Sequence, residues 1–118
     1  ILQPLIENAI YHGIKPSATP GIIKVKIKKV IDSKEKYDRS NELIKIVVSD
    51  NGVGMTEEKL ILLKESLNNS YISVGYGVKN VHERLKLTYG EEYSMNIDSE
   101  EDKGTTFTIY VPLIMQGE

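Results

Sequence analysis

The feature that most constrains the fold of this chain is the grouping of its strand patterns into two consecutive pairs. The four patterns cover residues 23–28, 43–48, 94–98 and 105–111. Apolar residues alternate with polar ones along most of them, which is typical of strands with one buried face. Strands that follow one another directly are joined most simply as antiparallel hairpins, so the pairs predict a mixed, largely antiparallel sheet. The polar segment 31–42 makes the first hairpin a long-looped one, and Pro112 stops the last strand.

Helix patterns precede and separate the strand pairs, at residues 2–13, 57–67 and 78–89. Pro4 fits only the first turn of the first helix, and Thr56 is a typical N-cap for the second. The expected apolar stripe of the third helix consists of Val78, Val81, Leu85 and Leu87. Gly90 is then placed to end that helix. The order α, β, β, α, α, β, β indicates an α+β fold, a two-layer α/β sandwich with helices on one face of the sheet.

Length and composition fit one compact domain, residues 1–118. The formal charge of −2 and the pI near 5.8 argue against a broadly basic surface that binds nucleic acid. Cysteine is absent from the sequence, which excludes disulfides and thiolate metal sites. No apolar run reaches the roughly 20 residues that span a bilayer. Because the chain begins at Ile1 and opens directly on a motif, we expect it to be a fragment of a longer protein.

Asp50 follows an apolar strand and begins the loop Asp50-Asn51-Gly52-Val53-Gly54. A carboxylate is costly to bury there unless hydrogen-bond donors surround it, and the amino group of adenine is such a donor. Guanine would present a carbonyl oxygen to the same carboxylate, so Asp50 would favour ATP over GTP. Gly52 and Gly54 would let the backbone approach the purine ring. On this segment alone, an ordinary Asp-Asn-Gly turn is an equally good interpretation.

Asn8 lies among apolar residues of the first helix, where an amide side chain has no favourable helix propensity. Its oxygen is a suitable ligand for Mg²⁺, which binds hard oxygen donors. His12 lies four residues later and shares that helix face, so it could donate a hydrogen bond to a phosphate. Taken singly, a helical Asn is more often a packing or surface residue, and a lone His is more often structural.

The sequence Gly75-Tyr76-Gly77 stands directly before the third helix. Two glycines permit close backbone approach, and a helix N-terminus offers unpaired N–H groups to a phosphate. The glycines could equally be hinges for the polar segment 68–73, which the combined interpretation makes a lid. Asn80 replaces the third glycine of a dinucleotide-binding fingerprint, and the chain contains no Gly-Lys-Ser/Thr motif, so both of those nucleotide folds are disfavoured.

Four segments in order carry a resemblance to a known family. They are LQPLIENAI at 2–10, DNGVGM at 50–55, GYGVKNVHERL at 75–85 and GTTF at 104–107. Together they resemble the N box and the glycine boxes of the GHKL ATPases, which share the Bergerat fold. The residues around Pro4 and those following Gly77 are similar to the LytS/YesM-type branch of sensor histidine kinases. The resemblance covers the chain from end to end.

This resemblance implies a binding site for ATP and Mg²⁺. Asn8 would hold the metal, Asp50 would bind the adenine amino group, and Thr105 would support that contact through its hydroxyl and a water. Thr105 is equally well explained as a β-forming residue in a strand. The implied ATP-binding residues are Asn8, His12, Lys15, Asp50, Gly52, Gly54, Gly75, Gly77, Val78 and Thr105.

Within that set, Gly54 would line the purine pocket, while Gly75, Gly77 and Val78 would offer backbone groups to the phosphates. Many histidine kinases carry a basic residue at the position occupied here by Tyr11. Phosphate contact would therefore pass to His12 or Lys15. The segment between the glycine boxes is short and has no phenylalanine, which implies a reduced lid.

Pro4 occupies the position at which hydrolytic GHKL enzymes carry a glutamate base, four residues before the metal-binding Asn. Glu7 is adjacent to Asn8 and projects about 100° away from it on a helix, so it is poorly placed to activate water. Histidine kinases need no such base, because a neutral imidazole already is a nucleophile. Anti-sigma-factor-type serine kinases also carry the earlier glutamate, and they remain an alternative beside a non-enzymatic interaction module of the same fold.

The resemblance also implies partners that lie outside this sequence. The phosphoacceptor histidine would belong to a separate dimerisation domain of the same protein, because His12 belongs to the pocket and His82 to the helix after the lid. A response regulator would act downstream. The full-length protein would be a homodimer, and this part of it would be the cytoplasmic domain of a membrane-anchored sensor.

Overall fold

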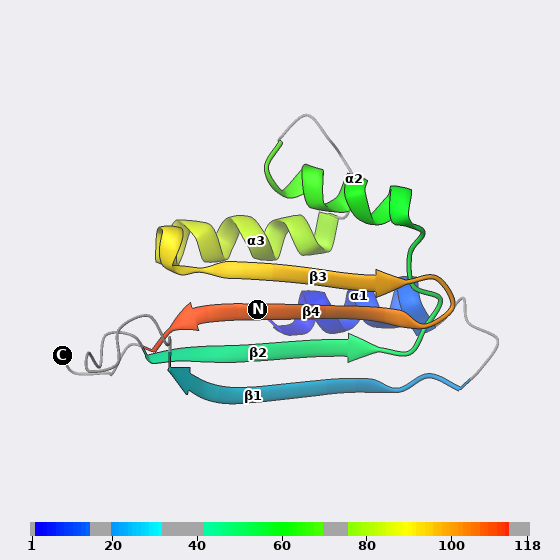
Figure 1. Ribbon diagram of the computed structural model, residues 1–118, viewed down its shortest axis with the longest axis horizontal. Helices are drawn as coiled ribbons and strands as arrows, with labels where there is room; N and C mark the ends of the chain where they lie inside the picture. Colours follow the sequence, from blue (N-terminus) through cyan, green and yellow to red (C-terminus); the bar gives the residue numbers. More distant parts are fainter. Residues whose placement is uncertain (1, 15–19, 32–41, 70–75, 114–118) are drawn as a thin grey trace.

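The computed structural model describes residues 2–14, 20–31, 42–69 and 76–113 of the chain. Figure 1 shows helices beside a single four-stranded sheet. In chain order the elements are α1 (Leu2–Asn8), η1 (Ala9–Ile14), β1 (Ile23–Ile31), β2 (Glu42–Asp50), α2 (Glu57–Leu67), α3 (Tyr76–Tyr89), η3 (Gly90–Glu92), β3 (Ser94–Glu100) and β4 (Gly104–Pro112). This order confirms the predicted α, β, β, α, α, β, β arrangement.

The sheet has the order β1-β2-β4-β3, and each of these neighbouring pairs is antiparallel. Consecutive strands pair as hairpins, and β4 then joins the two hairpins by pairing with β2. The prediction of a largely antiparallel sheet is confirmed, and no parallel pair occurs among the described strands. The α+β class is confirmed with it.

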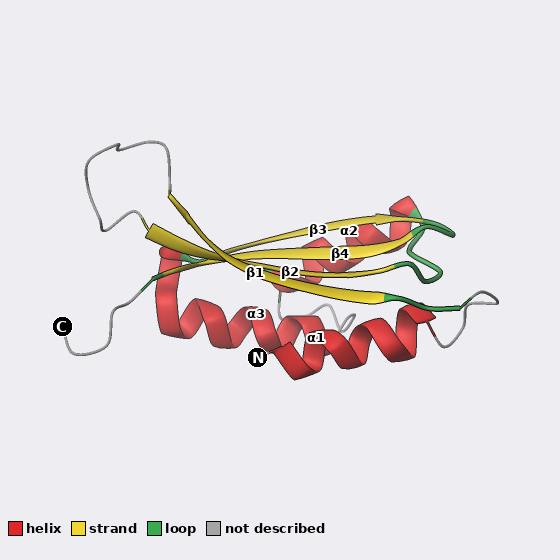
Figure 2. Ribbon diagram, turned by 90° about the horizontal axis from the view of Figure 1, so that it is seen from below, coloured by secondary structure: helices red, strands yellow, loops and turns green. Residues whose placement is uncertain are grey.

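Figures 1 and 2 together show a two-layer arrangement. The helices α1 and α3 lie on the same side of the sheet, whereas α2 lies beside the edge strand β3 and packs on β3 and α3. The core lies between the sheet and these helices. Its buried residues are Leu5, Val48, Leu63, Val78, Val81, Leu85, Tyr93, Ile97, Phe107, Ile109 and Val111. Among the described residues, every helix is too short or too polar to span a bilayer.

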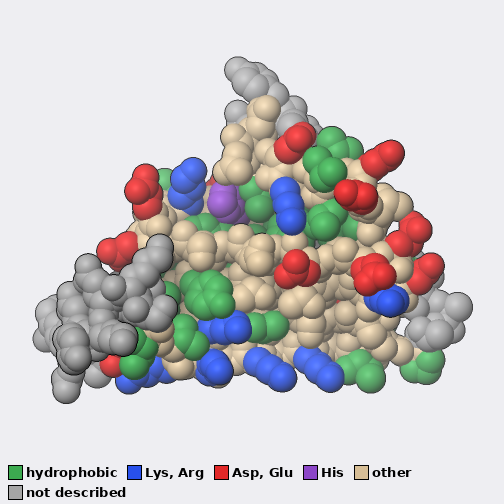
Figure 3. Space-filling view, viewed as in Figure 1, with side chains coloured by type: hydrophobic (Ala, Val, Ile, Leu, Met, Phe, Trp, Pro, Cys, Tyr) green, Lys and Arg blue, Asp and Glu red, His purple; other side chains and the backbone are tan. Residues whose placement is uncertain are grey.

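The edge strand β1 is confirmed, but its apolar face is not buried as the alternation predicts. Val25 pairs with the buried Val48 and so faces the helix side, yet it is 41% exposed, and Ile27 is 58% exposed. The reason is position, because the helices lie toward the β3 and β4 side of the sheet, away from its β1 edge (Figure 1). Figure 3 shows basic side chains in a row along this edge.

The helix boundaries follow the predicted capping chemistry. Thr56 is the N-cap of α2, and its hydroxyl accepts a hydrogen bond from the Lys59 amide at 3.2 Å. The helix α3 ends at Tyr89, and Gly90 follows with a φ of 62°. Leu87, which we expected in the apolar stripe, is 89% exposed. It lies about 200° around the helix from Leu85, on the solvent side.

Candidate functional site

A row of polar side chains crosses the sheet at one end of its apolar core. Ser99 of β3 pairs with Thr105 of β4, and Thr105 pairs with Asp50 of β2. Directly paired residues point to the same face, so all three side chains lie on the helix side. The neighbouring row is apolar and fully buried, and consists of Ile97, Phe107 and Val48. The sheet therefore changes from core to polar site within two residues of each strand.

Asp50 is a half-buried carboxylate held by backbone amides. The Gly52 amide donates to its Oδ1 at 2.8 Å, and the Thr105 amide donates to it as well. Burial raises the pKa of Asp50 above its ordinary value of 3.8, and the two amide hydrogen bonds lower it by less than burial raises it. A carboxyl group whose ionised form is destabilised by burial is typical of functional sites.

The Asp50 loop and the β3–β4 turn interlock through two glycines. Gly54 has a φ of 65°, and a Cβ there would lie 2.0 Å from the Glu100 carbonyl oxygen. Gly104 has a φ of 116°, and a Cβ there would lie 1.9 Å from the Asp50 carbonyl oxygen. The Asp102 amide also donates to the Val53 carbonyl at 2.7 Å. Gly54 is thus required by the packing of one backbone on another, which is a different reason from the purine contact that we predicted for it.

Asn51 performs a task that the sequence interpretation missed. Its Oδ1 accepts from the Ile22 amide at 2.7 Å, and its Nδ2 donates to the Pro20 carbonyl at 3.3 Å. The Asn51 amide donates in turn to the Ile22 carbonyl. This side chain therefore fastens the start of β1 to the Asp50 loop. The Asn-Gly dipeptide indicated a turn, but no local signal indicated a partner about 30 residues away.

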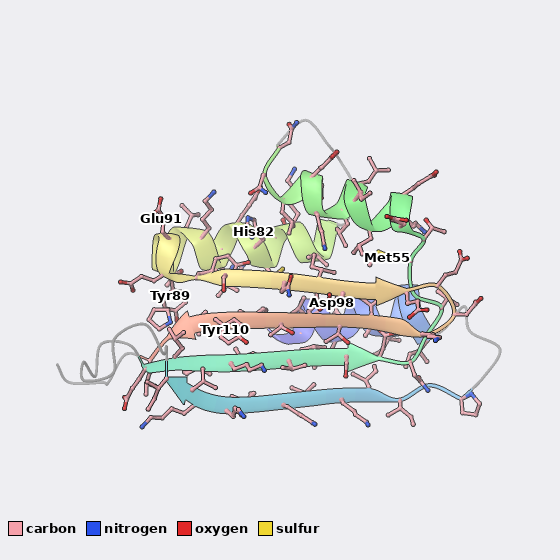
Figure 4. The ribbon with its side chains drawn as sticks, viewed as in Figure 1. Met55, His82, Tyr89, Glu91, Asp98 and Tyr110 are labelled. Carbon is pink, nitrogen blue, oxygen red and sulfur yellow. The ribbon has the colours of Figure 1, made fainter. Side chains whose placement is uncertain are left out.

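Ser99 is the second residue that the sequence interpretation missed. It stands in a polar stretch of β3, and nothing in its immediate neighbours indicates a task. In the fold its hydroxyl lies 2.9 Å from the Thr105 hydroxyl and 2.9 Å from the Met55 amide nitrogen. Met55 begins the segment that leads from the Asp50 loop to α2, beside the end of β3 (Figure 4).

The metal and phosphate end of the predicted site lies on the first helix. The chain is α-helical from Leu2 to Asn8 and π-helical from Ala9 to Ile14, and η1 packs against β2 and β4. The helix therefore extends one residue beyond the predicted end at residue 13. Single π-helical turns are rare and frequently occur at functional sites. The side chains of Asn8 and His12 lie outside the described residues, so their shared face and their roles stay predictions.

The phosphate-binding glycines are described only in part. Gly77 lies in the first turn of α3, inside the helix and not in the preceding loop as predicted. Val78 follows it with a fully buried side chain, 1% exposed, so only its backbone is available to a ligand. The first amides of a helix have no intrahelical partner, which is consistent with a phosphate role for both residues. Gly75 and Lys15 lie outside the described residues.

His82 has a structural environment. Its Nδ1 lies 2.8 Å from the Tyr93 hydroxyl, and its Nε2 is buried without a partner among the described residues. Burial and the nearby Lys86 lower the pKa of His82 from 6.5, while Glu83 raises it by less. Burial also raises the pKa of Tyr93 to about 12. Figure 4 shows His82 on α3. One ring nitrogen is engaged and the other enclosed, so His82 is a poor phosphoacceptor.

Comparison with known proteins agrees with this geometry. Residues 1–115 match the family described as histidine kinase-, DNA gyrase B-, and HSP90-like ATPase. The chain belongs to this family. It is 37% identical over 94% of its length to the sensor histidine kinase YesM of Bacillus subtilis (strain 168), covering 16% of that protein. It is 29% identical over 96% of its length to the sensor protein kinase HptS of Staphylococcus aureus (strain USA300), covering 20% of that protein.

The fold of this HATPase-family domain also resembles a solved structure. The histidine kinase domain of the Erythrobacter litoralis EL346 blue-light activated histidine kinase superposes with a TM-score of 0.58 at 20% identity. The match covers 93% of this chain and 43% of that one. The predicted family, the similarity to the YesM-type branch and the fold class are confirmed. The chain spans about a fifth or less of the length of the curated relatives named here.

Proposed function

We propose that this chain is the ATP-binding catalytic domain of a sensor histidine kinase, residues 1–118 acting as one domain of a longer protein. It would bind Mg-ATP and donate the γ-phosphoryl group to a histidine on a separate dimerisation domain. The observation that carries the proposal is the row of Asp50, Thr105 and Ser99 at the end of the buried sheet. A half-buried carboxylate beside a threonine hydroxyl suits the donor edge of adenine and opposes the carbonyl of guanine.

The role of magnesium in this proposal rests on Asn8. Asn8 is the last residue of α1, directly before η1. A neutral amide oxygen is a suitable Mg²⁺ ligand, and the bound metal would neutralise charge on the phosphates. His12 or Lys15 would contact the phosphates beside it, and the backbone of Gly75, Gly77 and Val78 would complete the site. These residues are proposed as ligands because they match the positions of the family motifs.

The absence of a hydrolytic base favours transfer to a protein over attack by water. Pro4 lies within α1 where hydrolytic relatives would carry glutamate. Glu7 is exposed, and its carboxylate accepts a hydrogen bond from Gln3 at 3.0 Å on the outer side of the helix. The buried face of α1 is instead formed around Leu5. An anti-sigma-type serine kinase would need the same missing glutamate, and an inert module would not need Asp50.

The partners follow from this function as proposals. We place the imidazole nucleophile outside this chain, because one ring nitrogen of His82 contacts the Tyr93 hydroxyl and the other, although unpaired, is buried. We therefore propose a histidine-bearing dimerisation domain of the same protein, a homodimeric full-length kinase and a downstream response regulator. The domain would lie on the cytoplasmic side of a membrane-anchored sensor.

The test is incubation of this chain with γ-labelled ATP and Mg²⁺, followed by separation under alkaline conditions that preserve phosphohistidine. We expect the chain to bind ATP but to carry no stable label. Stable label on His82 or His12 would contradict the assignment of the acceptor to another domain. Rapid release of labelled phosphate would contradict the argument from Pro4.

A further inference from the structure

Ser99 is the point at which three segments of the candidate site meet. Its Oγ accepts a hydrogen bond from the Met55 amide at 2.9 Å and donates one to the Gly104 carbonyl at 3.0 Å. The Thr105 hydroxyl lies 2.9 Å from the same oxygen. Ser99 thus joins the end of the Asp50 loop, the β3–β4 turn and the adjacent strand β4.

The directions of these hydrogen bonds follow from counting protons. A hydroxyl group has one proton and two lone pairs. The Met55 amide can only donate and the Gly104 carbonyl can only accept, so the single proton of Ser99 is directed to Gly104. The contact between the two hydroxyls is then a hydrogen bond only if Thr105 donates its proton to Ser99. Both lone pairs of the Thr105 hydroxyl remain for a ligand or a water.

We propose that Ser99 is a positioning residue for base selection, which holds the Thr105 hydroxyl in the orientation of a hydrogen-bond acceptor. The inference rests on the proposed binding of ATP at Asp50. An ionised carboxylate is also a pure acceptor, so the two neighbouring groups of the row offer lone pairs and no proton. Adenine presents an amino donor at position 6 to such a site, whereas guanine and hypoxanthine present a carbonyl oxygen.

Removal of Ser99 would free the Thr105 hydroxyl to rotate. No other partner of that hydroxyl occurs among the described residues, so its proton would become available to a carbonyl at position 6 of the base. Ser99 therefore selects adenine without touching it. A role in stability alone would instead weaken the binding of every nucleotide in the same proportion.

The test compares ATP with inosine triphosphate, which differs only in the carbonyl at position 6 and the proton at the adjacent nitrogen. Calorimetric titration of Ser99→Ala in the presence of Mg²⁺ is expected to show about fivefold weaker ATP binding, the effect of one neutral hydrogen bond. Inosine triphosphate should bind as well as before or better. The ratio of the two affinities should therefore fall at least fivefold relative to wild type.

Two further variants separate positioning from folding. Ser94→Ala makes the same change at an exposed position of the same strand and should leave the ratio unchanged. In a Thr105→Val background, Ser99→Ala should no longer alter the ratio, because the group through which it acts is gone. If Ser99→Ala does not fold, Ser99→Cys replaces it, since a thiol is a weak hydrogen-bond partner of similar size, and the ratio should fall in the same direction.

The results distinguish this inference from the proposed function. If the wild-type chain selects ATP over inosine triphosphate and the Ser99 variants show the same ratio of the two affinities as the wild type, the positioning role is wrong and the proposed function stands. An effect of Ser99→Ala on the ratio that persists in full in the Thr105→Val background also contradicts it. If the wild-type chain binds neither nucleotide, the proposed function itself fails.

Discussion

The substitution of Gly54 by alanine tests the interlock of the Asp50 loop with the β3–β4 turn, and Gly90 provides a matched control. The two glycines have nearly the same backbone conformation, with φ of 65° and 62°. A Cβ at Gly54 would lie 2.0 Å from the Glu100 carbonyl oxygen, whereas a Cβ at Gly90 would have no neighbour within 4 Å. Any difference between the two alanine variants therefore reports the packing of the loop on the turn.

The expected magnitudes follow from these geometries. A left-handed conformation costs a non-glycine residue about 1–2 kcal/mol, and the stiffer unfolded chain offsets about 0.4–1 kcal/mol of that. Gly90→Ala should thus lower the free energy of unfolding by about 1 kcal/mol. Gly54→Ala should have the same conformational cost and should also displace the β3–β4 turn. This displacement costs about 1–3 kcal/mol and includes loss of the hydrogen bond from the Asp102 amide to the Val53 carbonyl. Its total should be about 3 kcal/mol.

Urea unfolding followed by circular dichroism measures both values, with the slope of the transition as a check that the same surface unfolds. Gly90→Ala should also retain the Mg-ATP affinity of the wild type, because η3, which begins at Gly90, lies at the opposite end of the sheet from the end of β2 (Figure 1). Equal destabilisation by the two substitutions would refute the interlock. An increase in stability for Gly54→Ala would refute it more strongly.

Three other substitutions give independent tests. Burial raises the folded-state pKa of Asp50, so the stability that its protonated form contributes to the folded state is lost as the pH rises through that pKa. Asp50→Asn should therefore raise the melting temperature at pH 7 without nucleotide, but not below pH 3.8. A lower melting temperature at pH 7 would contradict this. The folded-state pKa of His82 is lowered, so the contribution of its neutral form to stability is complete above pH 6.5 and is lost as the pH falls through the folded-state pKa. His82→Gln should reduce the fall in the free energy of unfolding between pH 7.5 and pH 5, measured by urea unfolding. An unchanged pH profile would count against the buried contact with Tyr93. Thr56→Ala should lower the free energy of unfolding by about 1 kcal/mol in urea, because the hydrogen bond that the Thr56 hydroxyl accepts from the Lys59 amide is lost, while Thr56→Ser should cost little. Equal losses for the two variants would exclude the hydroxyl as the cap.

The elements could be predicted from the sequence because local signals define them. Pro4, Thr56 and Gly90 each act on the helix that contains or borders them, and the structure shows the helices where these residues place them. The alternation of Ile23 to Lys28 likewise predicts β1. Burial of that strand could not be predicted, because it depends on which strands the helices cover, and the sheet order is a property of the whole chain.

The candidate site could be predicted in part: residues whose type or family position points to a chemistry were selected, whereas residues that act through distant partners were not. Asp50 was selected for its carboxylate at the end of a strand and Thr105 through the family resemblance, and the structure brings them side by side. Asn51 and Ser99 were missed, because their partners lie far away in sequence or across the sheet. Gly54 was selected because it would let the backbone approach a purine ring, but the group that approaches it in the structure is the backbone of a turn that only the fold brings near.

The measurement that tests the account most directly is a calorimetric titration of this chain with ATP and with GTP, with and without Mg²⁺, for the wild type and Asp50→Ala. The account predicts magnesium-dependent binding of ATP by the wild type, much weaker binding of GTP, and loss of ATP binding in Asp50→Ala. Absence of magnesium-dependent ATP binding would contradict the proposed function. Equal binding of ATP and GTP by the wild type would contradict the role of Asp50 in selecting adenine.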